Sequence, residues 1–152
     1  MVKAIPDGYH SLTPYLVIKG AQDAITFYQQ AFNATLLLCL DMPDGSVAHA
    51  EMRVGNSSFM FSEESIEMGF TSPQTLGGSC VTLMVYTEDV DVFFQQAIAA
   101  GCEAIRPVEN QFYGDRAGTL KDPFGHIWTI ATHVEDVSEE ELNKRLADML
   151  SS

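Results

Sequence analysis

The chain repeats itself, and this repeat constrains its fold more than any other feature. Residues 27–34 read FYQQAFNA, and 66 positions later residues 93–100 read FFQQAIAA. Counted from three residues upstream, each copy has apolar residues at i, i+3, i+4, i+7 and i+8, the spacing of an amphipathic helix that lies on a sheet. Asp23 and Asp89 suit the N-termini of the two helices, and Gly101 suits the end of the second. The repeat predicts two copies of one supersecondary unit.

Strand-like runs flank both helices in the same order. One run precedes each helix and three follow it, at residues 15–18, 35–40, 47–54 and 58–62 in the first half and 81–86, 103–108, 116–120 and 126–132 in the second. Turn signals separate the runs that follow each helix, at residues 44–45, 55–56, 114–115 and 122–125. Both halves therefore read strand, helix, strand, strand, strand. This order predicts an α+β fold of tandem βαβββ modules, forming a curved mixed sheet around a cavity.

The length of 152 residues suits a single domain. The pattern divides it into a first module over residues 10–63, a second over 79–134 and an appended helix over 138–150. The stretch between the modules has no sustained period and is interpreted as a linker. The appended helix opens on a capping box, Ser138 to Glu141. Its apolar stripe predicts that it packs on the domain or on a second subunit.

Charge and composition exclude several classes of partner. Eight basic and 21 acidic residues give a net charge of −13, which repels phosphate backbones and anionic membrane surfaces. No apolar run approaches the roughly 18 residues of a membrane helix, and the first residues do not resemble a signal peptide. We therefore expect a cytoplasmic protein with no nucleic-acid and no membrane partner. The three scattered cysteines form neither a disulfide framework nor a metal knuckle and are expected to be buried.

Several strings resemble one superfamily. They are TPYLV at 13–17, AITFY at 24–28, HAEMR at 49–53, QFYGDR at 111–116, DPFGHIW at 122–128 and ATH at 131–133. Together with the duplicated βαβββ unit they resemble the vicinal-oxygen-chelate superfamily of glyoxalase I, bleomycin-resistance proteins and extradiol dioxygenases, and within it the PhnB-like branch. The resemblance spans roughly residues 12 to 150. It implies a small-molecule ligand in the cavity and a homodimer in which a partner chain completes cavities and open sheet edges.

Enzymes of that superfamily hold a divalent metal with His, Glu or Gln side chains. Aligning the helix strings and the DPFG turn puts the four ligand positions at Thr13, Ser62, Cys80 and Thr129. Cys80 follows Thr13 by 67 positions, and Thr129 follows Ser62 by the same number. Hydroxyl groups are poor ligands, and one cysteine does not hold a catalytic metal alone. We therefore expect no metal cofactor. A divalent metal remains the alternative if the alignment slips by one residue and brings in Glu63, which strand alternation otherwise turns to the opposite face.

The alternation of strand residues extends these positions into a cavity wall. If the four positions face inward, the ligand-binding candidates are Thr13, Tyr15, Met60, Ser62, Cys80, Thr82, Met84 and Thr129. They are joined by Tyr113, just before the turn at 114–115, and by Arg116, the first residue of the strand that follows. Val17, Ser58, Ile127 and Ala131 share their face. The opposite, more apolar set is expected to pack under the helices and comprises Leu16, Ile18, Phe59, Phe61, Val81, Leu83, Val85, Trp128 and Ile130. This division predicts a mildly polar pocket with methionine and aromatic walls.

The candidate catalytic residues lie on the strand at 47–54. His49 and Glu51 are two apart on one face, as a general base and its orienting carboxylate would be. The alternative is a solvated or ion-paired sheet face. If equivalent positions in the two halves are 67 residues apart, the counterpart of His49 in the second half is Arg116. Tyr113, Asp115 and Arg116 are predicted to form a hydrogen-bonded cluster at the cavity mouth, or else an Asp–Arg pair that fixes the turn.

Three functions agree with these patterns. The first is a metal-independent protein that binds a small organic ligand. The second is a metal-dependent lyase or dioxygenase of the vicinal-oxygen-chelate type, whose ligands would include His49, Glu51 or Glu63. The third is a metal-free lyase or isomerase with His49 as its base. No nucleotide-binding loop, serine-nucleophile elbow or HExxH helix is present in the sequence.

Overall fold

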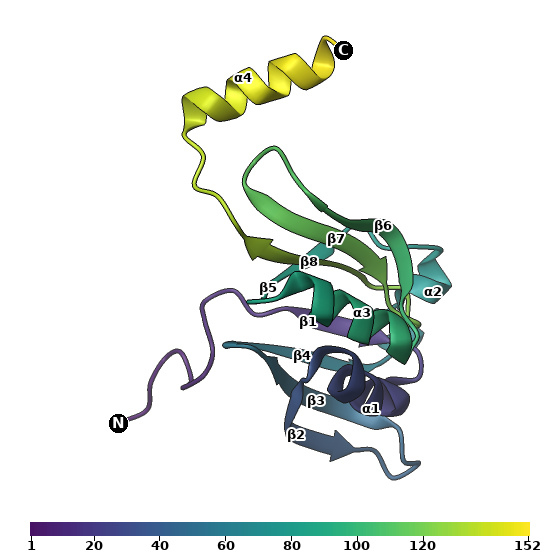
Figure 1. The fold of residues 1–152 in the computed structure, drawn as a ribbon. Helices are drawn as coiled ribbons and strands as arrows, with labels where there is room; N and C mark the ends of the chain where they lie inside the picture. Colours follow the sequence, from purple (N-terminus) through teal and green to yellow (C-terminus); the bar gives the residue numbers. More distant parts are fainter.

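The computed structural model describes residues 1–152 and contains two four-stranded sheets with their helices (Figure 1). In chain order the elements are β1 (Tyr15–Ile18), α1 (Ala21–Phe32), β2 (Thr35–Asp41), β3 (Val47–Val54), β4 (Ser57–Glu63), η1 (Ile66–Met68), α2 (Pro73–Leu76), β5 (Thr82–Tyr86), α3 (Val90–Ala100), β6 (Glu103–Asn110), β7 (Asp115–Lys121), β8 (Ile127–His133) and α4 (Glu139–Leu150). The predicted linker thus contains two short helical turns, η1 and α2. None of the helices has the length and apolar character needed to cross a membrane.

The two halves have the same topology. The strand order is β1-β4-β3-β2 in the first sheet and β5-β8-β7-β6 in the second. In each sheet the first and last strands of the unit pair in parallel, and the other pairs are antiparallel. The prediction of tandem βαβββ modules with a C-terminal helix is confirmed, and the predicted mixed sheet consists of two four-stranded parts.

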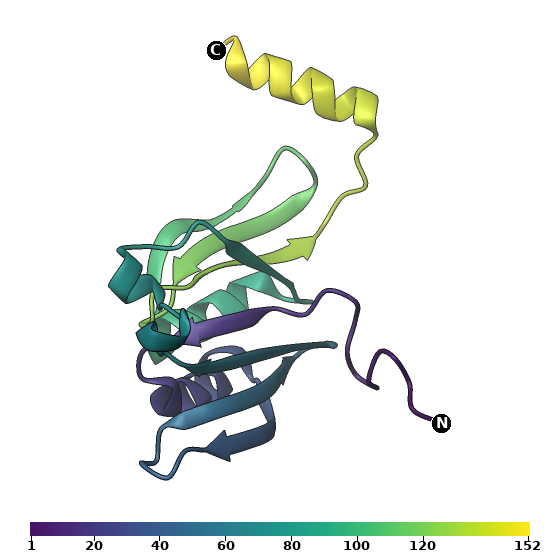
Figure 2. The same ribbon diagram turned by 180° about the vertical axis from the view of Figure 1, so that it is seen from behind.

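The helices of the two halves pack against each other between the sheets (Figure 2). The ring of Phe32 in α1 stacks on that of Phe93 in α3, with centroids 5.7 Å apart. Gln96 donates to the Gln30 carbonyl and to Asn33 Oδ1, each at 2.8 Å. Residues of both halves therefore form one continuous apolar core, in which each sheet buries its helix-covered face.

A buried carboxylate joins the two halves. Asp122, only 2% exposed, precedes β8. Its Oδ2 accepts the Tyr28 hydroxyl of α1 at 2.6 Å and the Trp128 indole N–H at 2.9 Å. Its Oδ1 accepts the backbone N–H groups of Phe124 and His126 at 2.9 and 3.0 Å. Burial and the Asp122 charge raise the pKa of Tyr28 well above its usual range, so the phenol stays a donor. The DPFG turn thus connects the halves.

The predicted division of the strands into two faces holds for most of its residues. Six of the nine residues assigned to the helix side are buried, namely Leu16, Ile18, Phe59, Phe61, Trp128 and Ile130. Leu83 and Val85 are partly buried against the same core. Val81 is 58% exposed because it precedes β5 and lies outside the sheet. Of the cysteines only Cys102 is buried, and the prediction of burial is wrong for Cys80, which is exposed in the segment before β5.

The two repeat helices are capped differently. Asp89 accepts the Val92 N–H at 3.2 Å and Gly101 ends α3, as predicted. Asp23 lies in the first turn of α1, also as predicted, but the cap position is Gly20, which has no side chain to accept a hydrogen bond. Glu63 of β4 accepts the N–H groups of Gly20 and Ala21, both at 3.0 Å. Glu63 therefore points to the helix side, opposite Ser62. It caps the N-terminus of α1 from the neighbouring strand β4.

We expect the variant Glu63→Ala to lose about 1 kcal/mol of unfolding free energy, because two orphan N–H groups of α1 lose their acceptor. Urea unfolding followed by circular dichroism measures the change. Glu67→Ala, at an exposed position with no such contact, is the control and should unfold like the wild type. An unchanged midpoint for Glu63→Ala would show that water replaces the carboxylate without cost.

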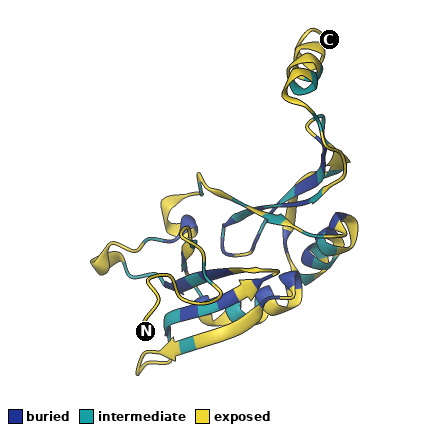
Figure 3. Ribbon diagram, turned by 90° about the vertical axis from the view of Figure 1, so that its left-hand side faces the viewer, coloured by how far each residue is buried: buried dark blue, intermediate teal, exposed yellow.

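The C-terminal helix stands apart from the body of the molecule (Figures 1 and 3). The Ser138 hydroxyl accepts the Glu141 N–H at 3.2 Å, as the capping box predicts. Arg145 holds the helix through Glu135 at 2.8 Å and the Phe112 carbonyl at 3.0 Å. No α4 residue is buried, and the apolar stripe is open to solvent, with Leu150 78% exposed. The prediction that α4 packs on its own domain is therefore wrong, and packing on a second subunit stays a prediction.

Candidate functional site

The first sheet has one face that no helix covers. Pairing places Tyr15 beside Met60 and Met60 beside Glu51, so these three side chains form one row across β1, β4 and β3. Val17 lies beside Ser62 in the next row. This is the face that the alternation predicted for the cavity.

Four side chains form a hydrogen-bonded chain on this face. His49 Nε2 lies 2.7 Å from Glu51 Oε2, and His49 Nδ1 lies 3.1 Å from the Tyr15 hydroxyl. Tyr9, from the segment before β1, donates its hydroxyl to Glu51 Oε1. The Ser58 hydroxyl donates to the Gly8 carbonyl at 2.8 Å and so fastens that segment to the sheet. The structure thus brings His49 and Glu51 together and adds two tyrosines.

The protonation of this chain follows from its contacts. Hydrogen bonds from Tyr9 and His49 lower the pKa of Glu51 below its usual range, so it is a carboxylate at neutral pH. Burial and the Glu51 contact raise the pKa of Tyr9 to about 12. A carboxylate accepts only, so in a neutral imidazole at this position the Nε2–H is the donor to Glu51. In that tautomer Nδ1 accepts the Tyr15 hydroxyl.

A cavity of about 610 Å³ lies over the same face. Tyr15 and Ser62 line it, together with apolar side chains of which Val47, Met68 and Phe70 are examples. Tyr15 is 45% exposed. Tyr15 also lines a second cavity of about 460 Å³, between β1, α2 and the start of β5, which includes Cys80. Tyr15 therefore borders two spaces that accommodate small molecules.

The four positions aligned with the superfamily's metal ligands do not form a metal site. The Thr13 hydroxyl donates to the His10 carbonyl at 3.1 Å. The Thr129 hydroxyl pairs with that of Thr119 at 2.8 Å. Ser62 and Cys80 offer one hydroxyl and one thiol, and nowhere do three His, Cys, Asp or Glu side chains gather as a metal would require. This donor set does not fit a catalytic divalent ion.

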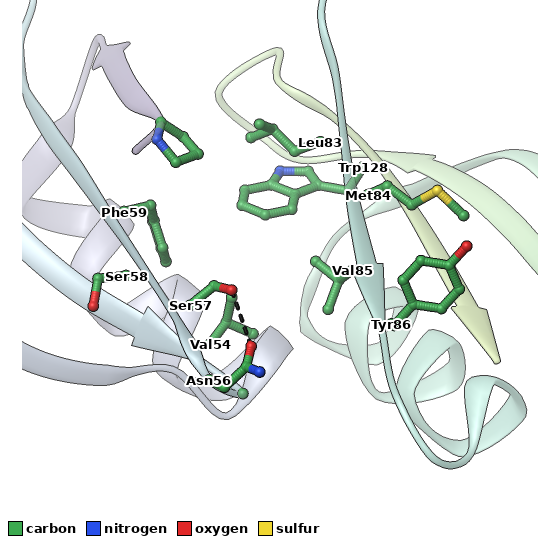
Figure 4. Close-up of a pocket in the computed structure, with 12 residues that line it drawn as sticks. Val54, Asn56, Ser57, Ser58, Phe59, Leu83, Met84, Val85, Tyr86 and Trp128 are labelled. Carbon is green, nitrogen blue, oxygen red and sulfur yellow. Dashed lines mark hydrogen bonds between the residues drawn. The ribbon is translucent and has the colours of Figure 1, made fainter. Parts of the chain in front are cut away.

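The remaining candidates on the second sheet lie on its helix-free face. Thr82 pairs with Ile127 and Met84 with Thr129, so all four point away from the helices. A gap of about 230 Å³ separates β5 from the β3–β4 hairpin (Figure 4). Its walls include the core residues Phe59 and Trp128, and Met84 stands at its edge. This gap is smaller than the cavity over the first sheet and has no comparable polar network.

The predicted cluster of Tyr113, Asp115 and Arg116 is wrong. Arg116 pairs with Asp91 of α3, through two bonds of 2.9 Å, and so lies on the helix side. The offset of 67 fails for this strand: β7 pairs Leu120 with Trp128, whereas β3 pairs Ala50 with Phe61. The structural counterpart of His49 is consequently Thr119, and the hairpin of the first half extends further than that of the second.

Asp115 belongs to a second polar cluster, which the sequence did not predict. It accepts the Tyr86 hydroxyl at 2.7 Å and contacts His133 Nδ1 at 2.8 Å. His133 Nε2 lies 2.7 Å from Asp136. The partners come from two strands and the segment after β8, with no shared period, so no local pattern links them. They fix the point where the chain leaves the sheet toward α4.

Hydrogen bonds to Asp115 and Asp136 raise the pKa of His133 above its usual range. The charged imidazole therefore stabilises the fold fully below the unfolded pKa of about 6.5, and this contribution disappears as the pH rises through the folded pKa. We expect His133→Gln to be more destabilising at about pH 5.5 than at about pH 9. Thermal unfolding at both pH values measures it, with His10→Gln as control. An equal loss at both would contradict the charged pair.

The chain is similar to one known superfamily over most of its length. The model of the Glyoxalase/Bleomycin resistance protein/Dioxygenase superfamily matches residues 10–130. The uncharacterized protein Mb0911c of Mycobacterium bovis is 36% identical over 140 residues, which cover 90% of this chain and 92% of that protein. The resemblance inferred from the sequence is confirmed.

Solved structures show the same architecture. TioX from Micromonospora sp. ML1 superposes with a TM-score of 0.66 at 24% identity, over 82% of this chain and 99% of TioX. The PhnB protein from Bacillus cereus, described as a putative 3-demethylubiquinone-9 3-methyltransferase, gives a TM-score of 0.63 at 21% identity, over 81% and 99% of the two chains. At these identities the similarity establishes the shared fold alone.

Proposed function

Because this chain belongs to the Glyoxalase/Bleomycin resistance protein/Dioxygenase superfamily, we propose that it binds a small organic molecule on the helix-free face of its first sheet, without a divalent metal. The observation that carries the proposal is the cavity of about 610 Å³ that Tyr15 and Ser62 line. Its size and its mixture of apolar walls with a few polar groups are those of a small-ligand site.

The lining and the charge limit the ligand. Met42, Val47, Met68 and Phe70 supply apolar contact, and the polar groups near them are hydroxyls and carboxylates. With a net charge of −13 the molecule repels anions. We therefore expect a neutral or cationic, largely apolar ligand that makes one or two hydrogen bonds.

Binding of the neutral apolar dye Nile red tests the site. We expect its fluorescence to rise with the wild type and not with Ser62→Phe, whose ring would occupy the cavity. Gln95→Phe, which adds the same ring at an exposed position of α3, should bind the dye like the wild type. Equal binding by Ser62→Phe would place the dye elsewhere and overturn the assignment of this face.

The absence of a functional metal is a separate part of the proposal. It is supported by the hydroxyl and thiol groups at the four aligned positions, two of which are already hydrogen-bonded within the chain. Elemental analysis after incubation with Mn²⁺, Fe²⁺, Ni²⁺ and Zn²⁺ should give no stoichiometric ion after dialysis. A tightly bound ion would favour the alternative, a metal-dependent lyase or dioxygenase.

A second copy of the chain is the partner that fits the open faces. Leu38 and Leu40 on β2 pair with Glu51 and His49, so they extend the helix-free face, and Leu40 is 51% exposed. Tyr86 on the second sheet is 59% exposed. Exposed apolar side chains on neighbouring strands commonly mark an interface. Light scattering should therefore give twice the chain mass of 16.7 kDa, and a monomer would contradict a homodimer.

A further inference from the structure

Both ring nitrogens of His49 are already engaged. Nε2 contacts Glu51 at 2.7 Å and Nδ1 contacts the Tyr15 hydroxyl at 3.1 Å. The imidazole therefore has no free nitrogen for a ligand, and any effect of His49 on a bound molecule passes through the oxygen of Tyr15. That oxygen belongs to a side chain that is 45% exposed and lines the cavity.

We infer that Tyr15 is the nucleophile of a Tyr15–His49–Glu51 triad that acts on neutral acyl compounds such as esters and thioesters. The order hydroxyl, imidazole, carboxylate is that of hydrolases in which the imidazole deprotonates the hydroxyl and the carboxylate holds the imidazole. A phenol is a stronger acid than an aliphatic hydroxyl, so less basicity is needed to activate it. This inference rests on the proposed function only in placing the ligand over the first sheet.

The acylation step needs only Tyr15, His49 and the acyl compound itself. The Tyr15 oxygen forms a bond to the acyl carbon while its proton passes to His49 Nδ1. The leaving oxygen or sulfur departs with the bonding pair and takes that proton from His49. The product is an aryl ester on Tyr15, a reactive acyl donor. Water then forms a bond to the acyl carbon and gives a proton to His49, the bond between that carbon and the Tyr15 oxygen breaks, and the Tyr15 oxygen takes the proton back from His49 as the acid leaves.

Two further side chains support the geometry. Tyr9 donates to the second oxygen of Glu51 and keeps the carboxylate facing His49, so Tyr9 and Glu51 are positioning residues. Ser62 lines the same cavity, and its hydroxyl makes no hydrogen bond within the chain, so it is free to donate to the acyl oxygen. The net charge of −13 disfavours anionic acyl compounds, and uncharged esters and thioesters avoid this repulsion.

The test uses p-nitrophenyl acetate with the full-length protein. We expect a burst of p-nitrophenolate, and acid quenching followed by peptide mapping should find the acetyl group on Tyr15. Tyr15→Phe should abolish the burst, and His49→Gln should slow acetylation about 100-fold, the usual loss when a general base is removed. Tyr86→Phe is the matched control, since Tyr86 is also exposed but donates to Asp115, and it should leave the burst unchanged.

The role of Glu51 has a readout independent of rate. In the wild type, the ring ¹⁵N shifts of His49 should report a proton on Nε2 and none on Nδ1. In Glu51→Gln the side-chain amide can donate to Nε2, which moves the proton to Nδ1. Nδ1 would then donate to the Tyr15 oxygen and could no longer take the proton of the Tyr15 hydroxyl. Glu51→Asp should restore part of the rate and the original tautomer. An unchanged tautomer in Glu51→Gln would contradict the positioning role.

Acetyl groups spread equally over Tyr15, Tyr86 and Tyr113, or an equal rate in His49→Gln, would overturn the triad. If His49→Gln fails to fold, the comparison of Tyr15→Phe with Tyr86→Phe still decides. The failures of the two proposals are distinguishable. Nile red binding with an inert Tyr15 sinks only the triad, and acetylation of Tyr15 without dye binding sinks only the proposed ligand site.

Discussion

Replacing Asp122 with alanine is expected to cost about 4 kcal/mol of unfolding free energy, because four donors lose one shared acceptor at a buried position. Two of these donors are the Tyr28 hydroxyl and the Trp128 indole, which belong to different halves of the molecule. The other two are the backbone N–H groups that shape the turn before β8. The loss therefore combines unsatisfied donors with a weakened contact between the halves. Urea unfolding followed by tryptophan fluorescence measures it.

Two variants separate the contributions. Tyr28→Phe removes only the hydrogen bond from Tyr28 to Asp122 and should cost about 2 kcal/mol, the usual value for a hydrogen bond to a charged group. Asp148→Ala, an exposed carboxylate in α4, is the control for loss of one negative charge and should be neutral. A loss below about 1 kcal/mol for Asp122→Ala would mean that water enters and satisfies the donors.

Gly114→Ala is expected to be nearly as damaging, at about 3 kcal/mol, because strain and collision coincide. Gly114 has φ +102°, and a Cβ there would lie 2.1 Å from the Glu135 carbonyl oxygen. The carbonyl of Gly114 also accepts the N–H groups of Val134 and Glu135. Relief requires the segment after β8 to move, so these two bonds would break and α4 would lose its attachment. Urea unfolding and limited proteolysis of the C-terminal segment measure the two effects.

Gly45→Ala separates strain from collision. Gly45 has φ +88° in the β2–β3 turn, and a Cβ there meets nothing within 4 Å. This variant should cost about 1 kcal/mol and leave the C-terminal segment resistant to protease. If Gly114→Ala behaves in the same way, the segment after β8 adjusts freely, and its hydrogen bonds to Gly114 contribute little.

Much of the fold could be predicted because it depends on periods that repeat along the chain. The 3.6-residue stripes located α1 and α3, and the alternation in the strands separated the buried Phe61 and Ile130 from Met60 and Thr129 on the helix-free faces. The periodic patterns do not predict that Glu63 caps the N-terminus of α1. Glu63 is far from Gly20 in the sequence, and only the parallel pairing of β1 with β4 brings the two together.

The candidate site was predictable in part for the same reason. His49 and Glu51 lie two apart on one strand, so alternation alone places them on one face. Tyr9 lies outside every periodic segment, and its contact with Glu51 depends on how the N-terminal segment crosses the sheet. Arg116 was misplaced because a single offset was applied to both hairpins. Register depends on where each turn begins, and the two turns differ in length.

The bond between Tyr28 and Asp122 has a consequence for how the protein is made. Its partners are 94 residues apart, so α1 leaves the ribosome long before its acceptor is synthesised. Until then the aromatic face of the first half has no partner, and the emerging chain exposes Phe32 and its neighbours to chaperones and to other nascent chains. Because closing so long a loop is entropically slow, docking of the halves is expected to be the last step of folding. A pause in translation before residue 122 would then lengthen the period in which the chain is prone to aggregate.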